Sequence, residues 1–189
     1  MKLKLKKSYL LGIAGLFVIV FGLSAGVFLV QKFALKTPKA VTDVTVSFNP
    51  ATANLPPNST LSVSIDAGTK SVAFAQIGFT FDKTKVRLSG EIQPITTKLQ
   101  TEIQRTTQVD ANNTGSAHLV LALAPGNTAP TGTFEFARIP ITAFTTTANQ
   151  VALVSLNLTD IQIVDTAGNQ LTVSGNSATL NLNTTRTAS

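Results

Sequence analysis

The stretch that decides the fold reads IGFTFDKTKVRL and covers residues 77–88. Ile77, Phe79 and Phe81 alternate with small or polar residues, and alternate residues of an extended chain face the same side. The alternation stops at the polar residues 82–85 and then resumes. The pattern predicts a core strand with the three apolar side chains on one buried face.

The same alternation recurs along the chain beyond residue 40, separated by Gly, Pro and Asn. It is found at residues 44–48, 61–65, 73–81, 119–123, 134–141, 153–158, 161–164 and 180–182. About eight to ten short strands of this kind favour an all-β, antiparallel sandwich. The prolines at 50, 56 and 57 predict a loop or an edge crossing, and residues 167–169 predict a hairpin turn.

One interval, residues 90–108, does not follow the strand pattern. Ile95, Leu99 and Ile103 are spaced four residues apart, which predicts a short helix on the sandwich surface. A long excursion of this kind is either a binding loop or a mobile one.

Residues Asp110 to Gly115, DANNTG, resemble the beginning of a calcium-binding loop. The position that should carry a bidentate Glu is Leu121, and helical flanks are not evident. We therefore expect a polar turn rather than a metal site.

The N-terminus predicts the location of the protein. Four lysines occur in the first seven residues, and an uncharged, mostly apolar run follows from Ser8 to Gln31. About 20 apolar residues are enough to span a bilayer, and Lys-rich flanks favour the cytoplasmic side. We interpret residues 1–31 as a cytoplasmic basic tip and a transmembrane signal anchor, followed by a basic linker at residues 32–40.

The alternative for this segment is a cleaved signal peptide, with Ser24 and Gly26 as small residues at the cleavage site. Either interpretation places the folded domain, residues 41–183, and its polar tail, residues 184–189, outside the cytoplasm. The predicted location is the cell envelope, with a single membrane pass, or the medium if the segment is cleaved.

The net charge of +6 is concentrated at the N-terminus. From residue 40 onward eight Lys or Arg stand against nine Asp or Glu, a net charge of −1. A nucleic-acid-binding domain needs a basic face, so this partner is not expected. The absence of Cys excludes disulfides, thiolate metal sites and a cysteine nucleophile.

No constellation of catalytic residues is recognisable. His118 is the only histidine, and it lies opposite in parity to the neighbouring leucines, which predicts a sheet-face or rim position. Asp160 and Asp165 are separated by a strand, too far apart for a paired-carboxylate site. We expect no enzymatic activity, no cofactor and no metal.

Four stretches together resemble the cohesin family, within the superfamily of cohesins and cellulose-binding modules. They are VSFNPATANLPPNSTLSVSIDAG (46–68), AQIGFTFDKTKVRLSG (75–90), HLVLALAPGNTAPTGTFEFARIPITA (118–143) and LNLTDIQIVDTAGNQLTV (156–173). They are similar to the opening strand–loop–strand, the central segment, the next hairpin and the closing hairpin of a cohesin. In the central segment the resemblance implies that residues 82–85 are a turn between two core strands. The chain departs from the family in lacking Pro after Asp82, and residues 91–110 are hard to align.

The resemblance implies a jelly-roll sandwich of nine strands that binds another protein through a sheet face. Cohesins bind dockerins, which are small calcium-loaded modules, so any calcium would belong to the partner. The outward residues of the longest strand, Gln76, Gly78 and Thr80, are the predicted contact set. Gly78 would either let a partner approach the backbone or mark a strand twist or bulge.

Two other functions stay open on the same fold. A carbohydrate-binding module needs aromatic platforms, and the chain has no Trp and one Tyr, Tyr9 in the apolar N-terminal run, which disfavours polysaccharide. The other alternative is a passive envelope or adhesin domain. The favoured interpretation is a membrane-anchored cell-surface module that recruits a dockerin-bearing protein.

Overall fold

In the computed structural model, which describes residues 42–56, 58–144 and 150–182, the deciding stretch begins in strand β4 (Val72–Phe81). Ile77, Phe79 and Phe81 are 1%, 2% and 7% exposed, and Thr80 on the opposite side is half-buried. The rings of Phe79 and Phe81 lie 6.4 Å apart, centroid to centroid. The predicted parity of this strand is confirmed.

The predicted turn at residues 82–85 is also confirmed. The carbonyl of Asp82 accepts hydrogen bonds from the backbone N–H groups of Lys85 and Val86, both at 3.0 Å. Its carboxylate accepts one from the Thr84 hydroxyl (2.6 Å) and one from the Thr84 N–H, and these bonds lower the pKa of Asp82. The turn carries the chain from β4 into β5 (Val86–Leu88), which belongs to the other sheet.

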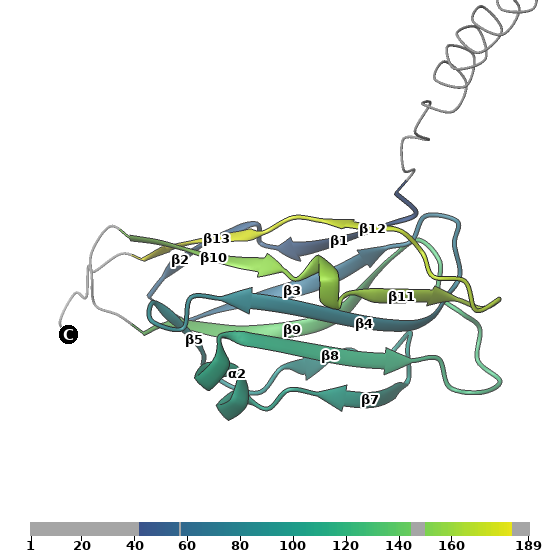
Figure 1. Cartoon of the computed structure of the whole chain (residues 1–189), viewed down its shortest axis with the longest axis horizontal. Coiled ribbons are helices and arrows are strands. Elements are labelled where there is room, and N and C mark those ends of the chain that lie inside the picture. Colours follow the sequence, from purple (N-terminus) through teal and green to yellow (C-terminus); the bar gives the residue numbers. More distant parts are fainter. Residues whose placement is uncertain (1–41, 57, 145–149, 183–189) are drawn as a thin grey trace, which may run out of the picture. The chain divides into compact units, whose positions relative to one another are not determined.

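Two sheets pack face to face (Figure 1). Sheet A has the order β12 (Val173–Gly175), β1 (Val44–Asn49), β3 (Ser59–Asp66), β9 (Thr133–Ala143) and β5, with β6 (Gln93–Pro94) also paired to β9. Sheet B has the order β2 (Thr52–Leu55), β13 (Ala178–Leu182), β10 (Gln150–Leu156), β4, β8 (Ser116–Ala122) and β7 (Thr101–Arg105), with β11 (Gln162–Asp165) paired to the first half of β4. The inward residues of both sheets form one apolar core, and no polar or charged side chain of the described residues is buried in it.

The expectation of about nine antiparallel strands is wrong in number and in part in direction. Thirteen strands are found in the described ranges, and β1–β12 and β2–β13 pair in parallel. The additional strands are short pieces of two to five residues, which are too short to produce a visible alternation. The parallel pairs arise because the chain crosses between the sheets at their edges, as the prolines around residues 50 and 56 indicated for β2.

The predicted helix within residues 90–108 is wrong. Leu99 is 1% exposed and Ile103 is 57% exposed, so the two do not share a buried face. The interval contains β6 and β7, and β7 pairs with β8 with a bulge between Glu102 and Gln104. Backbone pairing along the open edge of β8 overrides the fourfold spacing of the apolar residues.

A helix occurs slightly later, at α2 (Gln108–Thr114), where a polar turn was expected for residues 110–115. The Thr107 hydroxyl caps its N-terminus by accepting from the Asp110 N–H at 3.1 Å, and Gly115 ends it with φ = 77°. The Asn112 side chain bonds both backbone groups of Leu88, which fixes the helix against sheet A.

The two hairpins implied by the cohesin resemblance differ in outcome. Strands β8 and β9 lie in different sheets, so they are not a hairpin, and residues 123–132 cross between the layers. The closing turn is present: Gly168 has φ = 87° and donates to the carbonyl of Asp165 at 3.1 Å. Hydrogen bonds from Asn169 to the Asp165 carboxylate lower the pKa of Asp165.

Residues Thr42 to Ser189 form one compact unit. Among the residues that the structure describes, no helix is long and apolar enough to cross a membrane. The predicted anchor at residues 8–31, the linker at 32–40 and the tail at 184–189 lie outside the described residues.

Burial of the β4 phenylalanines leads to a stability prediction. Phe79→Ala and Phe81→Ala should each lower the free energy of unfolding by roughly 3–5 kcal/mol, because each removes a ring from a closed core. Thr80→Ala, on the half-buried side of the same strand, should cost less than about 1 kcal/mol. Chemical denaturation of the three variants measures this, and equal small losses at all three positions would contradict the assigned parity.

Candidate partner-binding face

The outward residues of the three central strands of sheet B are uncharged. None of the residues that the register of these strands turns outward is Asp, Glu, Lys or Arg. They are Phe74, Gln76, Gly78 and Thr80 of β4, Val151, Leu153 and Ser155 of β10, and Ser116, His118, Val120 and Ala122 of β8. Figure 1 shows this face toward the viewer. Protein interfaces are depleted of charge at their centre, so a broad face without charged strand residues suits a protein partner.

The outer face of sheet A differs in charge. Glu135 and Arg138 of β9 form an ion pair at 2.8 Å, and the Ser62 hydroxyl of β3 donates to the same carboxylate at 2.7 Å. The bonds from Arg138 and Ser62 lower the pKa of Glu135, and the pKa of Arg138 is raised. The outer face of sheet A therefore carries charged strand residues, and we assign the candidate site to sheet B.

Exposed apolar side chains add to the uncharged face at one end of β10. Val151 and Leu153 are each 51% exposed. They lie on the same side of β10 as Ser155, which pairs with Thr80, and continue its row past the end of β4, where the Lys85 ammonium donates to the Val151 carbonyl at 3.3 Å. Exposed apolar groups of this kind provide the area that desolvation of an interface requires.

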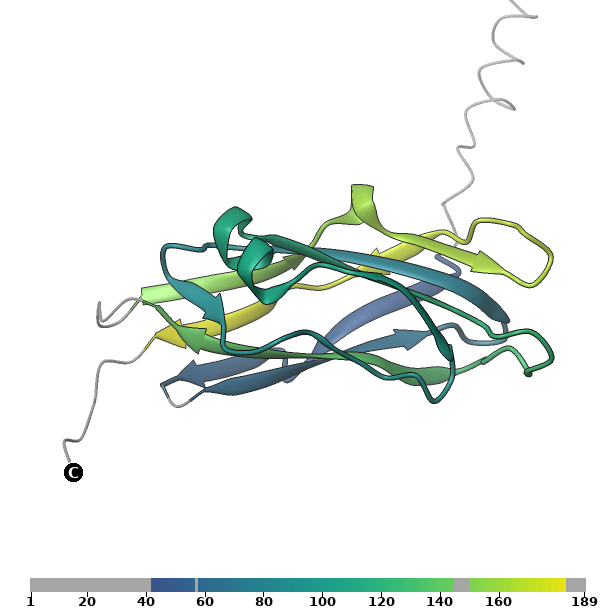
Figure 2. The same ribbon diagram turned by 90° about the horizontal axis from the view of Figure 1, so that it is seen from below.

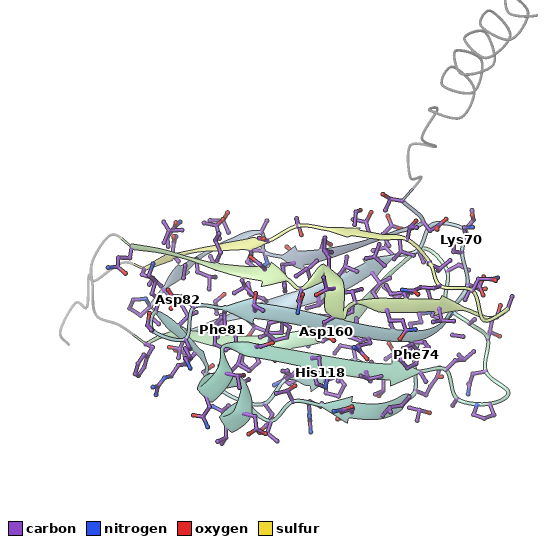
Figure 3. All side chains as sticks on the ribbon, viewed as in Figure 1. Lys70, Phe74, Phe81, Asp82, His118 and Asp160 are labelled. Atoms are coloured by element: carbon purple, nitrogen blue, oxygen red, sulfur yellow. The ribbon has the colours of Figure 1, made fainter. Side chains whose placement is uncertain are left out.

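The three predicted contact residues lie in one row on β4, but two of them are already in contact with the chain itself. A short 3-10 helix, η1 (Leu158–Asp160), connects β10 to β11 and lies over β4 (Figure 3). Gln76 is half-buried and donates to the Asp160 carboxylate at 2.7 Å and to the Asp160 carbonyl at 3.3 Å. Thr80 is half-buried beyond the end of η1.

Gly78 is buried beneath η1. A Cβ at this position would lie 2.9 Å from both Cβ and Cγ of Asp160 and closer still to its Oδ2. The Gly78 carbonyl also accepts a hydrogen bond from the Asn157 N–H at 2.9 Å. The close approach to the Gly78 backbone that was expected of a partner is thus made by Asp160 of the same chain.

His118 lies on the sheet face, as predicted. It pairs with Gly78 across β4 and β8, and its Nδ1 lies 3.4 Å from the Thr106 hydroxyl oxygen. Within residues 42–56, 58–144 and 150–182, no cluster of His, Asp or Glu is grouped to hold a metal ion. The arrangement therefore offers a contact surface and no assembled chemical centre.

Sequence reasoning missed η1, although a signal for it exists. Asn157, Thr159 and Asp160 are turn-forming residues placed between two apolar runs, and the Thr159 hydroxyl donates to the Asn157 side chain at 2.7 Å. Gly78 on β4 is a second signal for η1, but it can be interpreted only together with Asp160, which lies 82 positions further along the chain.

Comparison with solved structures identifies the fold. The solution structure of a cohesin from Clostridium acetobutylicum matches with a TM-score of 0.62 at 11% identity, over 78% of this chain and 96% of that one. A cohesin–dockerin complex from Clostridium thermocellum matches with 0.62 at 7% identity, over 78% and 98% of the two chains. A non-cellulosomal cohesin from the archaeon Archaeoglobus fulgidus matches with 0.55 at 15% identity, over 74% and 91%. No family model and no curated protein matches the sequence.

The described domain therefore has the cohesin fold, which confirms the resemblance read from the four sequence stretches. At these identities the comparisons establish architecture alone, and the residues that contact a partner must be argued from this chain.

The packing of η1 on Gly78 leads to a second prediction. Gly78→Ala should lower the free energy of unfolding by roughly 1–3 kcal/mol, because the new methyl group overlaps Asp160. Without that overlap, Ala in a strand should be neutral or stabilising by about 0.5–1 kcal/mol, since Gly costs more backbone entropy. The same substitution in an Asp160→Gly background should therefore lose its cost. A double-mutant cycle by chemical denaturation tests this, and an equal cost in both backgrounds would refute the contact.

Proposed function

We propose that this protein is a cohesin-like recruiting module whose sheet B outer face binds a dockerin-type protein. The observation that carries the proposal is the broad outer face without charged strand residues, with exposed apolar side chains at its rim, on a cohesin fold. A standard protein interface buries about 800 Å² on each partner, which a sheet face of this size can supply.

Within this face, the open part is centred on Thr80 and on the neighbouring residues Val151 and Leu153 of β10. Gln76 and Gly78 both contact Asp160, and in this proposal they hold η1 in place beside that surface. Thr80 is then the one of the three predicted residues that would meet the partner directly.

The proposed role is binding without catalysis. The comparison structures that share this fold are binding modules, and the sheet B face of this chain has uncharged groups suited to contact. A polysaccharide platform is less well supported, because Phe74 is the only Phe, Tyr or Trp among the outward residues of the three central strands and the chain has no Trp.

The binding proposal is tested with the fragment 42–189, a compact unit that contains the whole described core. A calcium-loaded dockerin panel is titrated by calorimetry against wild type and a Thr80→Arg, Leu153→Asp double variant. The variant should bind at least about a hundredfold more weakly, because two charges would enter an uncharged interface. Ser64→Arg, on the outer face of sheet A, is the matched control and should bind like wild type.

Calcium provides a separate readout of the same experiment. Chelation should abolish binding while the melting temperature of the fragment alone stays unchanged, because the ion would belong to the partner. Unimpaired binding by the double variant, or a melting temperature of this domain that falls on chelation, would show that the proposed face is wrong.

We further propose that the domain is displayed outside the cell, held by residues 8–31 as a signal anchor. The support is the lysine-flanked apolar run of the sequence. The full chain should fractionate with membranes, need detergent for release and be digested by protease added to intact cells. A soluble form that begins near residue 27 would instead show that the segment is cleaved.

A further inference from the structure

One charged residue stands over the candidate face. Asp160 is the only Asp, Glu, Lys or Arg in β4, β8, β10 and η1 taken together. Figure 2 shows η1 standing out from the surface of the sandwich, and Figure 3 shows Asp160 over β4. A partner that covers this face therefore also covers a carboxylate.

The Asp160 carboxylate is held in place by its own chain. Its Oδ1 accepts a hydrogen bond from the Gln76 amide at 2.7 Å, and the Asp160 N–H donates to the Asn157 carbonyl at 2.8 Å. Its Oδ2 lies against Gly78, in the space that a side chain at that position would fill. Because the group is ordered before any partner arrives, binding to it costs this domain little conformational entropy.

The charge of Asp160 is not matched by a cation. Among the half-buried carboxylates of the described part, Asp43 and Glu135 pair with Lys or Arg, and Asp165 accepts backbone N–H groups of its own turn. Asp160 takes part in none of the ion pairs of the described residues, and its Oδ2 has no hydrogen-bond donor among them.

The residues around Asp160 do not supply the missing cation. The neighbouring strands carry no Lys or Arg, as described above. His118 pairs with Gly78 in the register of β8 and β4, but its Nδ1 faces the Thr106 hydroxyl and it forms no ion pair with Asp160. A cation for this carboxylate has to come from another molecule.

A partner protein that covers the face would remove water from Asp160. Burying a carboxylate without a partner strongly opposes association, whereas a cation placed at hydrogen-bond distance offsets the loss of water. A bound divalent ion is not the expected solution, because calcium takes about six to eight oxygen ligands. In the described part of the chain, no three His, Asp or Glu are grouped to hold such an ion.

We propose that the recruited protein places one Lys or Arg side chain against Asp160. The inference rests on the proposed recruiting function and adds the charge that the partner carries at this point. One free oxygen predicts a single charge-assisted hydrogen bond, which the Lys ammonium or one Arg N–H can make. Asp160 thereby discriminates between partners, because a module with an apolar or acidic side chain at that position would leave the buried carboxylate unpaired.

Asp160→Asn tests the inference because it removes the charge and keeps the shape of the side chain. The Asn oxygen can still accept from Gln76, so the melting temperature of fragment 42–189 should stay close to that of wild type. A calcium-loaded dockerin that binds wild type should bind this variant roughly tenfold to a hundredfold more weakly in calorimetry. Asp66→Asn, the same chemical change on β3 of sheet A, is the matched control and should bind like wild type.

A double-mutant cycle identifies the cation on the partner. Each Lys and Arg of the bound dockerin is replaced by Gln in turn and titrated against wild type and Asp160→Asn. One replacement should weaken binding to wild type by about tenfold or more and leave binding to Asp160→Asn almost unchanged, because the two side chains then no longer interact.

A selection from random peptides displayed on phage tests the same charge preference without a known partner. Peptides are selected on the wild-type fragment, and those that fail to bind the Thr80→Arg, Leu153→Asp double variant are sequenced. These face-binding peptides should share a Lys or Arg and should also bind Asp160→Asn more weakly.

The inference is overturned if the dockerin binds Asp160→Asn like wild type, or if none of its Lys or Arg residues couples to Asp160. A dockerin that is lost in the Thr80→Arg, Leu153→Asp variant but unaffected by Asp160→Asn would overturn the inference and leave the recruiting proposal standing. If no dockerin binds, the recruiting proposal fails and the peptides decide the role of Asp160. Face-binding peptides that share a Lys or Arg would then support it, and their absence, or peptides without a cation, would overturn it.

Discussion

Burial of the inward face of β4 is the constraint on which the other features of this domain depend. The strand pairs with β8 along one side and with β10 and β11 in succession along the other, so its apolar row sets the register of three neighbours. Because side chains alternate with a period of two, any shift of one residue would turn Phe79 and Phe81 to the solvent. The same constraint fixes which residues face outward, and hence the composition of the candidate face.

The parts of the fold that follow from local periodicity could be predicted from the sequence. The parity of Ile77, Phe79 and Phe81, the turn at Asp82 and the turn at Gly168 each depend on a few adjacent residues. The assignment of β8 and β9 to different sheets could not be predicted in this way, because alternation shows which side of a strand is buried and not which layer it joins. Ile103 misled for a related reason: an exposed residue in a bulge matched a helical spacing by chance.

The candidate site was predicted in its general location and not in its detail. Gln76, Gly78 and Thr80 do share one face, yet η1 covers the first two, and that cover comes from Asp160, more than 80 residues away. Long-range packing of this kind leaves only an indirect trace, a glycine in the middle of a long strand. What the sequence does convey is the composition of the face, and the lack of charge on it is the property that the recruiting proposal uses.

The edges of the two sheets restrict how this domain can associate. The outermost strands of the described part, β12, β5 and β2, have only three or four residues each. β7 is longer, but its bulge and its Glu102–Arg105 ion pair interrupt the ladder that an incoming strand would need. Short, bulged and charged edges are how β-proteins avoid open-ended aggregation. Crowded copies of this domain are therefore protected from polymerising strand to strand into fibrils, and contact between them is left to side chains on the faces.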